Sequence, residues 1–313
     1  MAEIGIVIVT YFSEAEIGAC LDAALSTGAD VVVVDNASGD GTIAEVARRG
    51  VRLIANPVNR GFAAAVNQGF AAVNSPYILL LNPDAILESG LDALRVACEL
   101  PRSAGAGGLL LGADGRPQSG FMFRALPTPG VLILEAILLN RVWAANPINR
   151  RYRGLGADCS RRMAVEQPAG AFLMIRREVW SELGGFDEGF FPLWFEDVDF
   201  CRRAANRGYV LYFEPGAVAK HTGAHSIHKM DVEMRRVCWY RSLLRYTAKH
   251  FRPTASRAVC LGVLTGSLLR AILESAFERS LKPMATYGKV ARLAGRCLLF
   301  GWRDEVVLSG PLK

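Results

Sequence analysis

The sequence lacks the paired cysteines that form the disulfides of small secreted domains or bind a structural zinc ion. Its 313 residues include seven cysteines, which are scattered and odd in number, and no two of them form a Cys-x-x-Cys pair. This usage disfavours a disulfide framework and a zinc site, and it is typical of a reducing compartment. A chain of this length buries enough apolar surface to fold without either device.

Export signals and long apolar runs are also missing. The first residues carry Glu3 where a signal peptide carries basic residues, and the apolar run that follows is short. The longest apolar candidate, residues 258–269, is stopped by Arg270 before it reaches the roughly 18 residues of a membrane span. We therefore expect a cytoplasmic protein with no spanning segment.

Charge is unevenly distributed along the chain. The formal net charge is +6, and between Arg241 and Arg303 twelve Lys or Arg residues face only two acids. Such a basic segment indicates an anionic partner, which could be a bilayer or a nucleic acid. No interleaving of aromatic and basic residues and no nucleic-acid-binding motif is present, so we expect no nucleic acid partner.

The C-terminal part, residues 230–313, is predicted to be a helical extension that contacts an anionic membrane surface. An apolar stripe at helical spacing is formed by Leu261, Leu264, Leu268 and Ile272. The cations around it are Arg257, Arg270, Arg279, Lys282, Lys289, Arg292 and Arg296. Helices of this kind lie in the membrane interface. The alternative is a helical subdomain that packs its apolar face and leaves its charges in solvent.

The first hundred residues alternate strand and helix patterns, which predicts an α/β fold with a mainly parallel sheet. Strands are expected at 4–9, 30–35 and 77–81, which are rich in Val, Ile and Leu and typical of buried strands, and a short strand is expected at 51–55. Helices are expected at 14–26, after Thr42, and at 62–73. Residues 101–165 are rich in Gly, Pro and Arg and predict long loops around a short helix near 130–140. Further strands are expected at 171–175 and 209–213, with helices starting near 176 and 196.

Polar clusters follow several of these strands. They are Thr10-Tyr11, Asp35 to Ser38, Asn82 to Asp84 and, later, Glu196-Asp197. In an open α/β sheet, ligands bind beyond the carboxyl ends of the strands, so the clusters predict one common site. Each cluster alone could instead be a turn or a helix cap. Asp199 is interpreted as structural, because Arg203 lies four residues further along the expected helix.

The ordered set of motifs resembles that of family 2 glycosyltransferases. The matching segments are Val33 to Thr42, Asn59 to Phe62 with Asn67 to Gly69, Leu81 to Asp84, Gly184 to Glu188 and Trp194 to Asp199, within residues 3–226. The versions Asn-Pro-Asp-Ala and Phe-Glu-Asp-Val-Asp-Phe-Cys-Arg-Arg are most similar to the bacterial rhamnosyltransferase branch. The resemblance implies a GT-A-type, Rossmann-like mixed sheet flanked by helices over residues 1–229, followed by the extension at 230–313.

The resemblance also assigns expected roles to individual residues. The nucleotide-sugar site would comprise Thr10, Tyr11, Asp35, Asn36, Arg60, Gly61 and Asn82, with Asp35 accepting a hydrogen bond from the base. Asp84 and His221 would hold Mg²⁺ or Mn²⁺, because a hard cation neutralises the charge of a departing diphosphate; His225 and His228 have weaker claims. Asp197 would be the catalytic base, and Glu196 would orient it or bind the acceptor. Asn82 replaces the usual first Asp of the metal motif and supplies a neutral contact at most.

The expected activity is therefore inverting, metal-dependent sugar transfer from a nucleoside diphosphate, with rhamnose as the sugar. The acceptor would be a glycan or a polyprenyl-diphosphate-linked glycan, placing the enzyme peripherally on the inner face of the plasma membrane. Alternatives are another donor (UDP-hexose, UDP-N-acetylhexosamine or UDP-galactofuranose) or a non-catalytic sugar-nucleotide-binding scaffold. A sugar-1-phosphate nucleotidyltransferase is disfavoured, because residues 10–13 lack the Gly-rich loop of that class.

Overall fold

The computed structural model describes residues 2–223 and 230–303, which form two compact units. Among these residues, the sheet unit comprises 2–126, 153–188 and 196–223, and the helical unit comprises 127–152, 189–195 and 230–303. We predicted a single division after residue 229; in the structure, segments 127–152 and 189–195 also group with the helical unit. His225 and His228 lie outside the described residues.

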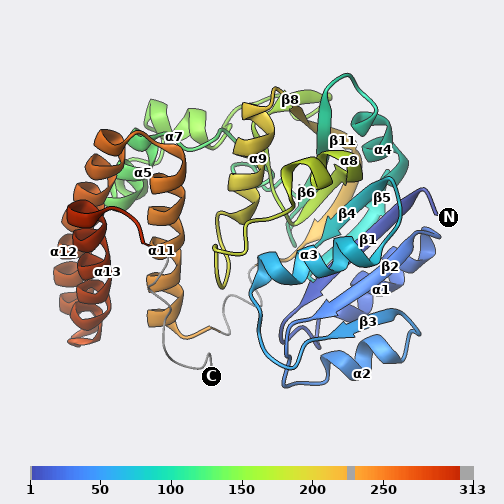
Figure 1. Ribbon diagram of the computed structural model, residues 1–313, viewed down its shortest axis with the longest axis horizontal. Helices are drawn as coiled ribbons and strands as arrows, with labels where there is room; N and C mark the ends of the chain where they lie inside the picture. The colour runs from blue at the N-terminus through green and yellow to red at the C-terminus, as the bar shows by residue number, and fades with distance from the viewer. Residues whose placement is uncertain (1, 224–229, 304–313) are drawn as a thin grey trace. The chain divides into compact units, whose positions relative to one another are not determined.

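A nine-stranded sheet forms the centre of the sheet unit (Figure 1). Its strand order is β3-β2-β1-β4-β10-β6-β11-β5, with β8 paired to β11. The strands are β1 (Ile4–Thr10), β2 (Asp30–Asp35), β3 (Arg52–Ala55), β4 (Tyr77–Leu81), β5 (Ala85–Ser89), β6 (Ser103–Leu111), β8 (Met163–Val165), β10 (Phe172–Arg176) and β11 (Val210–His221). A separate two-stranded sheet pairs β7 (Phe123–Arg124) with β9 (Gln167–Pro168).

The sheet is mixed, as predicted. Strands β1 to β4 pair in parallel, whereas β10 runs antiparallel to both β4 and β6. Strand β11 is parallel to β6 but antiparallel to β5 and β8. The parallel strands β1, β2 and β4 are the runs of Val, Ile and Leu that the sequence predicted, and they are buried because helices cover both faces.

The prediction of loops from residue 101 onward was wrong at its start, because β6 is a nine-residue strand inside the sheet. Its sequence, Ser-Ala-Gly-Ala-Gly-Gly-Leu-Leu-Leu, has little strand propensity. Close packing explains the small residues. A Cβ atom on Gly105 would lie 2.2 Å from the carbonyl oxygen of Met174, and one on Gly108 would lie 2.2 Å from the Phe172 ring. Gly here marks a close approach of neighbouring chain segments.

Helices cover both faces of the sheet. They are α1 (Ile17–Ser26), α2 (Thr42–Ala47), α3 (Phe62–Ala72), α4 (Leu91–Cys98), α8 (Arg177–Leu183) and α9 (Glu196–Asn206). Side chains of α1, α2 and α4 share one hydrophobic core with Ile6 and Ile8 of β1. Side chains of α3, α8 and α9 share the other core with Val7 and Val9. The alternation of side chains along β1 therefore places α3 and α9 on the same side of the sheet.

Within residues 127–152, 189–195 and 230–303, the helical unit contains six helices. They are α5 (Pro129–Ala136), α6 (Leu139–Val142), α7 (Pro147–Tyr152), α11 (Val232–His250), α12 (Pro253–Glu278) and α13 (Lys282–Phe300). Helices α12 and α13 form a hairpin joined by residues 279–281, and α12 also packs against α5 (Figure 1). A Cβ atom on Gly266 would lie 2.0 Å from the carbonyl oxygen of Ala136, so a small residue is required where α12 meets α5.

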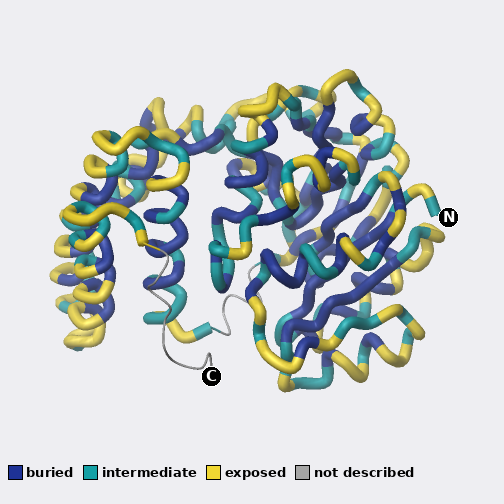
Figure 2. Tube along the Cα trace, in the orientation of Figure 1, coloured by how far each residue is buried: buried dark blue, intermediate teal, exposed yellow. Residues whose placement is uncertain are grey.

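Helix α12 bears on the expectation that no segment spans a membrane. By length and composition alone, it is long and apolar enough to cross a bilayer, despite Arg270. Core helices of soluble proteins can meet the same criterion. Many residues of α12 and α13 are exposed (Figure 2). All seven cysteines are free thiols.

Candidate active site

The carboxyl ends of β1 and β2 bring Thr10 and Asp35 together. The two residues are register partners in the parallel ladder, and the Thr10 hydroxyl donates to Asp35 Oδ1 at 2.8 Å. Ser38 donates its hydroxyl to Oδ1 at 2.6 Å and its backbone N–H to Oδ2 at 2.9 Å. The Asp35 side chain is 0% exposed. In this structure the carboxylate therefore organises the turn after β2.

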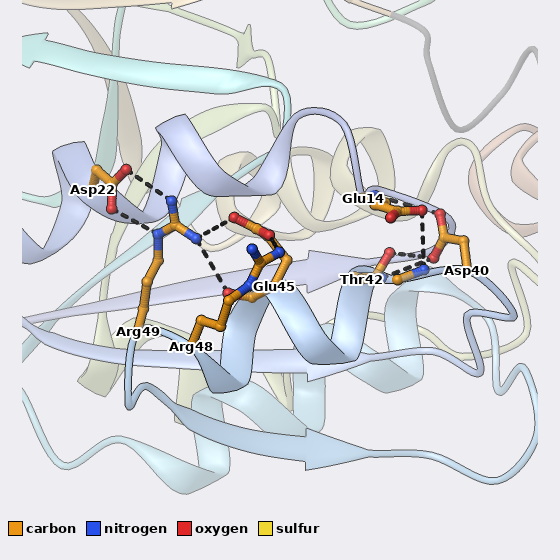
Figure 3. A network of polar contacts seen from close by, with 8 residues as sticks. Glu14, Asp22, Asp40, Thr42, Glu45, Arg48 and Arg49 are labelled. Atoms are coloured by element: carbon orange, nitrogen blue, oxygen red, sulfur yellow. Dashed lines mark hydrogen bonds and ion pairs between the residues drawn. The ribbon is translucent and has the colours of Figure 1, made fainter.

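The loop after β2 is fixed by a network of polar contacts (Figure 3). Glu14 accepts a hydrogen bond from the backbone N–H of Gly41, and Asp40 accepts from the backbone N–H groups of Glu14 and Thr42. Just beyond the end of α2, Arg49 pairs with Asp22 of α1 and with Glu45 of α2. These contacts tie α2 and the loop before it to the residues that follow β1.

Asn36 and Asn59 connect the turn after β2 to the start of α3. Asn36 donates to Asn59 Oδ1 at 2.8 Å and accepts from the backbone N–H of Arg60 at 2.9 Å. Gly61 adopts φ 85°, which permits the chain to turn into α3, and its N–H donates to Asn59 Oδ1. The Arg60 side chain is exposed at the start of this helix, and Tyr11 is half-buried.

Asp84 and His221 meet where β5 begins and β11 ends. His221 is the register partner of Ala85, and the backbone N–H of Thr222 donates to the Asp84 carbonyl at 3.3 Å. His221 Nε2 lies 3.4 Å from Asp84 Oδ1, and within the described chain it makes no hydrogen bond. Both side chains are buried. Asn82 lies next to them at the end of β4, where its N–H donates to the carbonyl of Ala171.

Gln118 holds the His221 imidazole from its other side. The Gln118 Oε1 atom lies 2.9 Å from His221 Nδ1, and the Gln118 Nε2 group donates to the His221 carbonyl at 2.8 Å. The Phe121 ring stacks on the imidazole, with ring centroids 5.2 Å apart and planes inclined by 9°. Pattern reading missed both residues, because the segment around them was predicted only as loop.

Asp197 lies in the first turn of α9, and three donors hold its carboxylate. Gln167 Nε2 and the backbone N–H of Gly170 donate to Oδ2 at 3.2 and 3.3 Å, and the N–H of Val198 donates to Oδ1 at 2.8 Å. Burial raises the pKa of Asp197, and the hydrogen bonds from Val198 and Gly170 together with the charge of Arg124 oppose this rise.

Glu196 precedes Asp197 and is almost completely buried. Burial, and then the adjacent charge of Asp197, raise the pKa of Glu196 well above that of an exposed glutamate. Its Oε2 atom makes no hydrogen bond to any described residue.

Trp194 and Phe195, which lead into α9, both have positive φ, at 78° and 71°. Such backbone costs of order 1–3 kcal/mol per non-glycine residue and is commonest at functional sites.

Asp199, which the sequence analysis interpreted as structural, forms the expected ion pair. Arg203 Nε donates to Asp199 Oδ2 at 2.7 Å, and its other two nitrogens donate to the carbonyls of Leu183 and Gly185.

Asn67 of α3 had no individual role in the sequence analysis, but it connects two segments of the sheet unit. It donates to the Phe186 carbonyl at 3.0 Å and accepts from the Phe186 N–H, which ties α3 to the Gly184–Glu188 segment.

Comparison with known proteins finds a family match in the N-terminal part of the chain. Residues 5–96 match the model of Glycosyl transferase family 2. This part of the chain is thus similar to family 2 glycosyltransferases. The chain is 29% identical over 260 residues to N-acetylglucosaminyl-diphospho-decaprenol L-rhamnosyltransferase of Mycobacterium tuberculosis, an alignment covering 74% of this chain and 83% of the relative. It is 26% identical over 176 residues to rhamnosyltransferase WbbL of Escherichia coli, covering 55% of this chain and 62% of that protein.

Solved structures show the same fold. A mannosyltransferase from Pyrobaculum calidifontis in complex with GDP-Man and Mn²⁺ aligns with a TM-score of 0.53 at 17% identity, over 96% of this glycosyltransferase and 88% of that chain. GalNAc-T7 with UDP, GalNAc and Mn²⁺ aligns with a TM-score of 0.52 at 16% identity, over 71% of this chain and 44% of that one. The predicted resemblance to family 2 glycosyltransferases, and to their rhamnosyltransferase branch, is confirmed.

Proposed function

We propose that this glycosyltransferase transfers rhamnose, with inversion, from a nucleoside diphosphate to a hydroxyl of a polyprenyl-diphosphate-linked glycan. The curated relatives described above are rhamnosyltransferases, and the mycobacterial one is named for a diphospho-decaprenol-linked acceptor. The observation that carries the proposal is the buried Asp84–His221 pair, whose facing atoms lie 3.4 Å apart beside the end of β4. Two facing ligand atoms favour a cation between them, at the edge where the sheet binds its ligand.

The metal proposal fits the residues that are present. Asp84 and His221 would hold Mg²⁺ or Mn²⁺, and a cation held by few side chains leaves positions for diphosphate oxygens and water. When bound, this ion neutralises charge that develops on the departing diphosphate. Within the described chain, no group of three His, Cys, Asp or Glu side chains gathers at one point. A pair of protein ligands suits a metal site in which oxygens of the substrate diphosphate supply further ligands. Asn82 offers a neutral amide beside the pair.

Asp197 is the proposed base. The acceptor oxygen attacks the anomeric carbon while its proton moves to the Asp197 carboxylate, and the bond from that carbon to the diphosphate breaks with its electron pair on the diphosphate. Two hydrogen bonds occupy Oδ2 and one occupies Oδ1, so Oδ1 retains a lone pair for the proton. The raised pKa makes this carboxylate a stronger base than an exposed aspartate. Glu196 would bind an acceptor hydroxyl or orient Asp197.

The nucleotide would lie over the ends of β1 and β2. Its proposed contacts are Thr10, Tyr11, Asp35, Asn36, Arg60 and Gly61. Because Asp35 is 0% exposed, a base reaches its carboxylate only if the loop at 36–41 moves. Ala37 in this loop has φ 66°, a conformation that a non-glycine residue rarely adopts. The exposed guanidinium of Arg60 offers a planar fork for a base edge or a phosphate.

A donor screen tests the assignment. Thermal shift with dTDP-rhamnose, UDP-glucose, UDP-galactose, UDP-N-acetylglucosamine and GDP-mannose should give a Mn²⁺-dependent rise with dTDP-rhamnose. A ligand at 100 times its Kd stabilises by about 2.7 kcal/mol, which is readily measured. Asp84→Asn should lose the part of the thermal shift that depends on Mn²⁺. Asp197→Asn should keep donor binding and lose roughly 100-fold or more in transfer.

Asp92→Asn on the exposed surface of α4 is the matched control and should behave as the wild type. A flat response to every donor would contradict the donor proposal. Full transfer by Asp197→Asn would refute its role as base, and the absence of transfer by the wild type with a bound donor would favour a non-catalytic scaffold.

We further propose that the helical unit binds the inner face of the plasma membrane. Leu261, Leu268 and Ile272 of the predicted stripe are 53%, 65% and 56% exposed, whereas Leu264 is half-buried. Phe277 at the hairpin end is 90% exposed. The exposed cations Lys282, Lys289, Arg292 and Arg296 recur on one face of α13. Apolar burial and about 1 kcal/mol per cation near anionic lipid both favour an interfacial position. Free thiols agree with the cytoplasmic side.

Vesicle sedimentation tests this surface. The wild type should sediment with phosphatidylglycerol vesicles and much less with phosphatidylcholine vesicles. The double variant Leu268→Gln/Ile272→Gln should lose most of this binding. Val58→Gln, which changes a 63% exposed residue of the sheet unit, is the matched control. Unchanged sedimentation of the double variant would refute the surface, and a dimer that this variant dissociates in light scattering would assign the stripe to a second copy instead.

A further inference from the structure

The Gln118 side chain makes two hydrogen bonds to one residue, and their pattern places a proton on Nδ1 of the imidazole. The His221 carbonyl can only accept a hydrogen bond, so the Gln118 atom 2.8 Å away must be its NH₂ group. The other end of the same amide, which faces His221 Nδ1 at 2.9 Å, is therefore the carbonyl oxygen. An amide carbonyl accepts only, so Nδ1 must carry the proton.

The consequence appears at the opposite nitrogen. A neutral imidazole carries one proton, so protonated Nδ1 leaves a lone pair on Nε2. That atom faces Asp84 Oδ1 at 3.4 Å and has no hydrogen-bond partner within the described chain. His221 is 4% exposed, so water contributes little there. We propose that Gln118 is a positioning residue that holds His221 as the Nδ1–H tautomer and keeps the Nε2 lone pair directed toward the Asp84 carboxylate.

Backbone contacts alone cannot set this orientation. The pairing of β11 with β5 places the α-carbons of His221 and Ala85 opposite each other, but it leaves the ring free to rotate about two side-chain torsions. Gln118 is itself immobilised. Its N–H donates to the Leu110 carbonyl at 2.9 Å, and its carbonyl accepts from Phe121 and Met122. The stacked Phe121 ring then restricts the plane of the imidazole.

The same segment also reaches the proposed base. The Met122 carbonyl accepts from the N–H of Ala169, and Arg124 is the register partner of Gln167, whose side chain donates to Asp197. Residues 118–124 therefore support Asp84–His221 through Gln118 and support Asp197 through the β7–β9 pair. The proton on Nδ1 follows from the hydrogen bonds alone, and the lone pair on Nε2 belongs to the neutral imidazole. The use of that lone pair for a divalent cation rests on the function proposed above.

Nitrogen-15 NMR of labelled histidine tests the tautomer without any metal or substrate. The chain has four histidines, and the signal lost in His221→Asn identifies His221. At pH 8.5, the wild type should show protonated Nδ1 and unprotonated Nε2. Gln118→Met keeps the side-chain length but removes both hydrogen bonds, and should shift His221 toward the Nε2–H form. Gln118→Glu still accepts from Nδ1–H and should preserve the wild-type pattern.

Mn²⁺ affinity gives the second readout. Electron paramagnetic resonance of free Mn²⁺ in the presence of dTDP should show 10- to 100-fold weaker binding for Gln118→Met, the usual effect of removing a residue that orients a ligand. Gln118→Glu should bind Mn²⁺ at least as tightly as the wild type. If Gln118 were merely structural, the Glu variant would weaken binding as much as the Met variant does, because it also loses the bond to the carbonyl.

The two ideas fail in different ways. An Nε2–H tautomer in the wild type, or an unchanged pattern in Gln118→Met, overturns the inference about Gln118. The predicted NMR pattern combined with no Mn²⁺ binding by the wild type supports the tautomer and refutes the proposed metal site.

Discussion

The ion pair between Arg203 and Asp199 offers a prediction with a calculable size. Arg203 uses three nitrogens on three acceptors, at 2.7 Å to Asp199 Oδ2, 2.6 Å to the Leu183 carbonyl and 2.7 Å to the Gly185 carbonyl. Asp199 is 0% exposed. Removing one partner of a buried ion pair costs about 3–5 kcal/mol, because the remaining buried charge loses that partner's attraction. We expect Arg203→Met to destabilise the protein by this amount.

Arg203→Lys separates charge from geometry. Lysine keeps the positive charge but cannot reach all three acceptors, so two hydrogen bonds of about 1 kcal/mol each are lost and we expect about 2 kcal/mol. Arg52→Met is the matched control. Arg52 also pairs with an aspartate, at 3.1 Å to Asp30, but both side chains are well exposed, so its loss should cost at most about 1 kcal/mol.

Urea denaturation followed by tryptophan fluorescence measures all three variants, with stability taken from the midpoint and slope. If Arg203→Met cost no more than Arg52→Met, burial would not govern this pair and the reasoning would be wrong. If Arg203→Lys were as damaging as Arg203→Met, the carbonyl contacts rather than the charge would dominate.

Three further outcomes are expected. Glu196 has a raised pKa in the folded protein, so its contribution to stability is present below the unfolded-state pKa and is lost as the pH rises through the folded-state pKa. The Glu196→Gln variant should therefore be more stable than the wild type at pH 8, and this gain should be smaller at pH 4. Denaturation at both pH values measures the difference. Because burial raises the pKa of Asp197, kcat/KM should fall on the acid side with a midpoint above that of an exposed aspartate, and a pH–rate profile with a midpoint at or below that value would exclude Asp197 as the base. Gly105→Ala should destabilise the protein by about 1–3 kcal/mol, because the new Cβ would lie 2.2 Å from a backbone oxygen. In α13, the Cβ of Gly288→Ala would meet nothing within 4 Å, so this variant should be more stable by up to about 1 kcal/mol. Thermal unfolding of both variants measures the two effects.

The parts of the fold that the sequence predicted are those where local pattern and burial agree. Strands β1, β2 and β4 are continuous apolar runs, and the polar residues that follow them, such as Asp35 and Asp84, mark the strand ends. Strand β6 escaped prediction because its Gly and Ala residues are selected by the close approach of β10, which is remote in sequence. Propensity reflects local preference and cannot register such contacts.

The candidate site divides in the same way. Asp84, His221 and Asp197 were predicted as site residues because they stand in segments that resemble family motifs. Their supports were not identifiable, because Gln118 contacts His221 across 103 positions and Gln167 contacts Asp197 across 30. A lone glutamine in a Gly- and Pro-rich stretch carries no local signal of either partner.

The free, buried cysteines allow local unfolding of each unit to be followed by thiol alkylation. Burial raises the thiol pKa of Cys98 to about 12 and that of Cys238 and Cys260 to about 11, and it raises the pKa of Cys20 and Cys201 as well. A covered, protonated thiol does not react with alkylating reagents, so each one is modified only when its surroundings unfold. Cys20, Cys98 and Cys201 lie in the sheet unit, and Cys238 and Cys260 lie in the helical unit. Pulsed alkylation followed by peptide mass spectrometry could therefore time the loss of each unit separately in one unmodified protein.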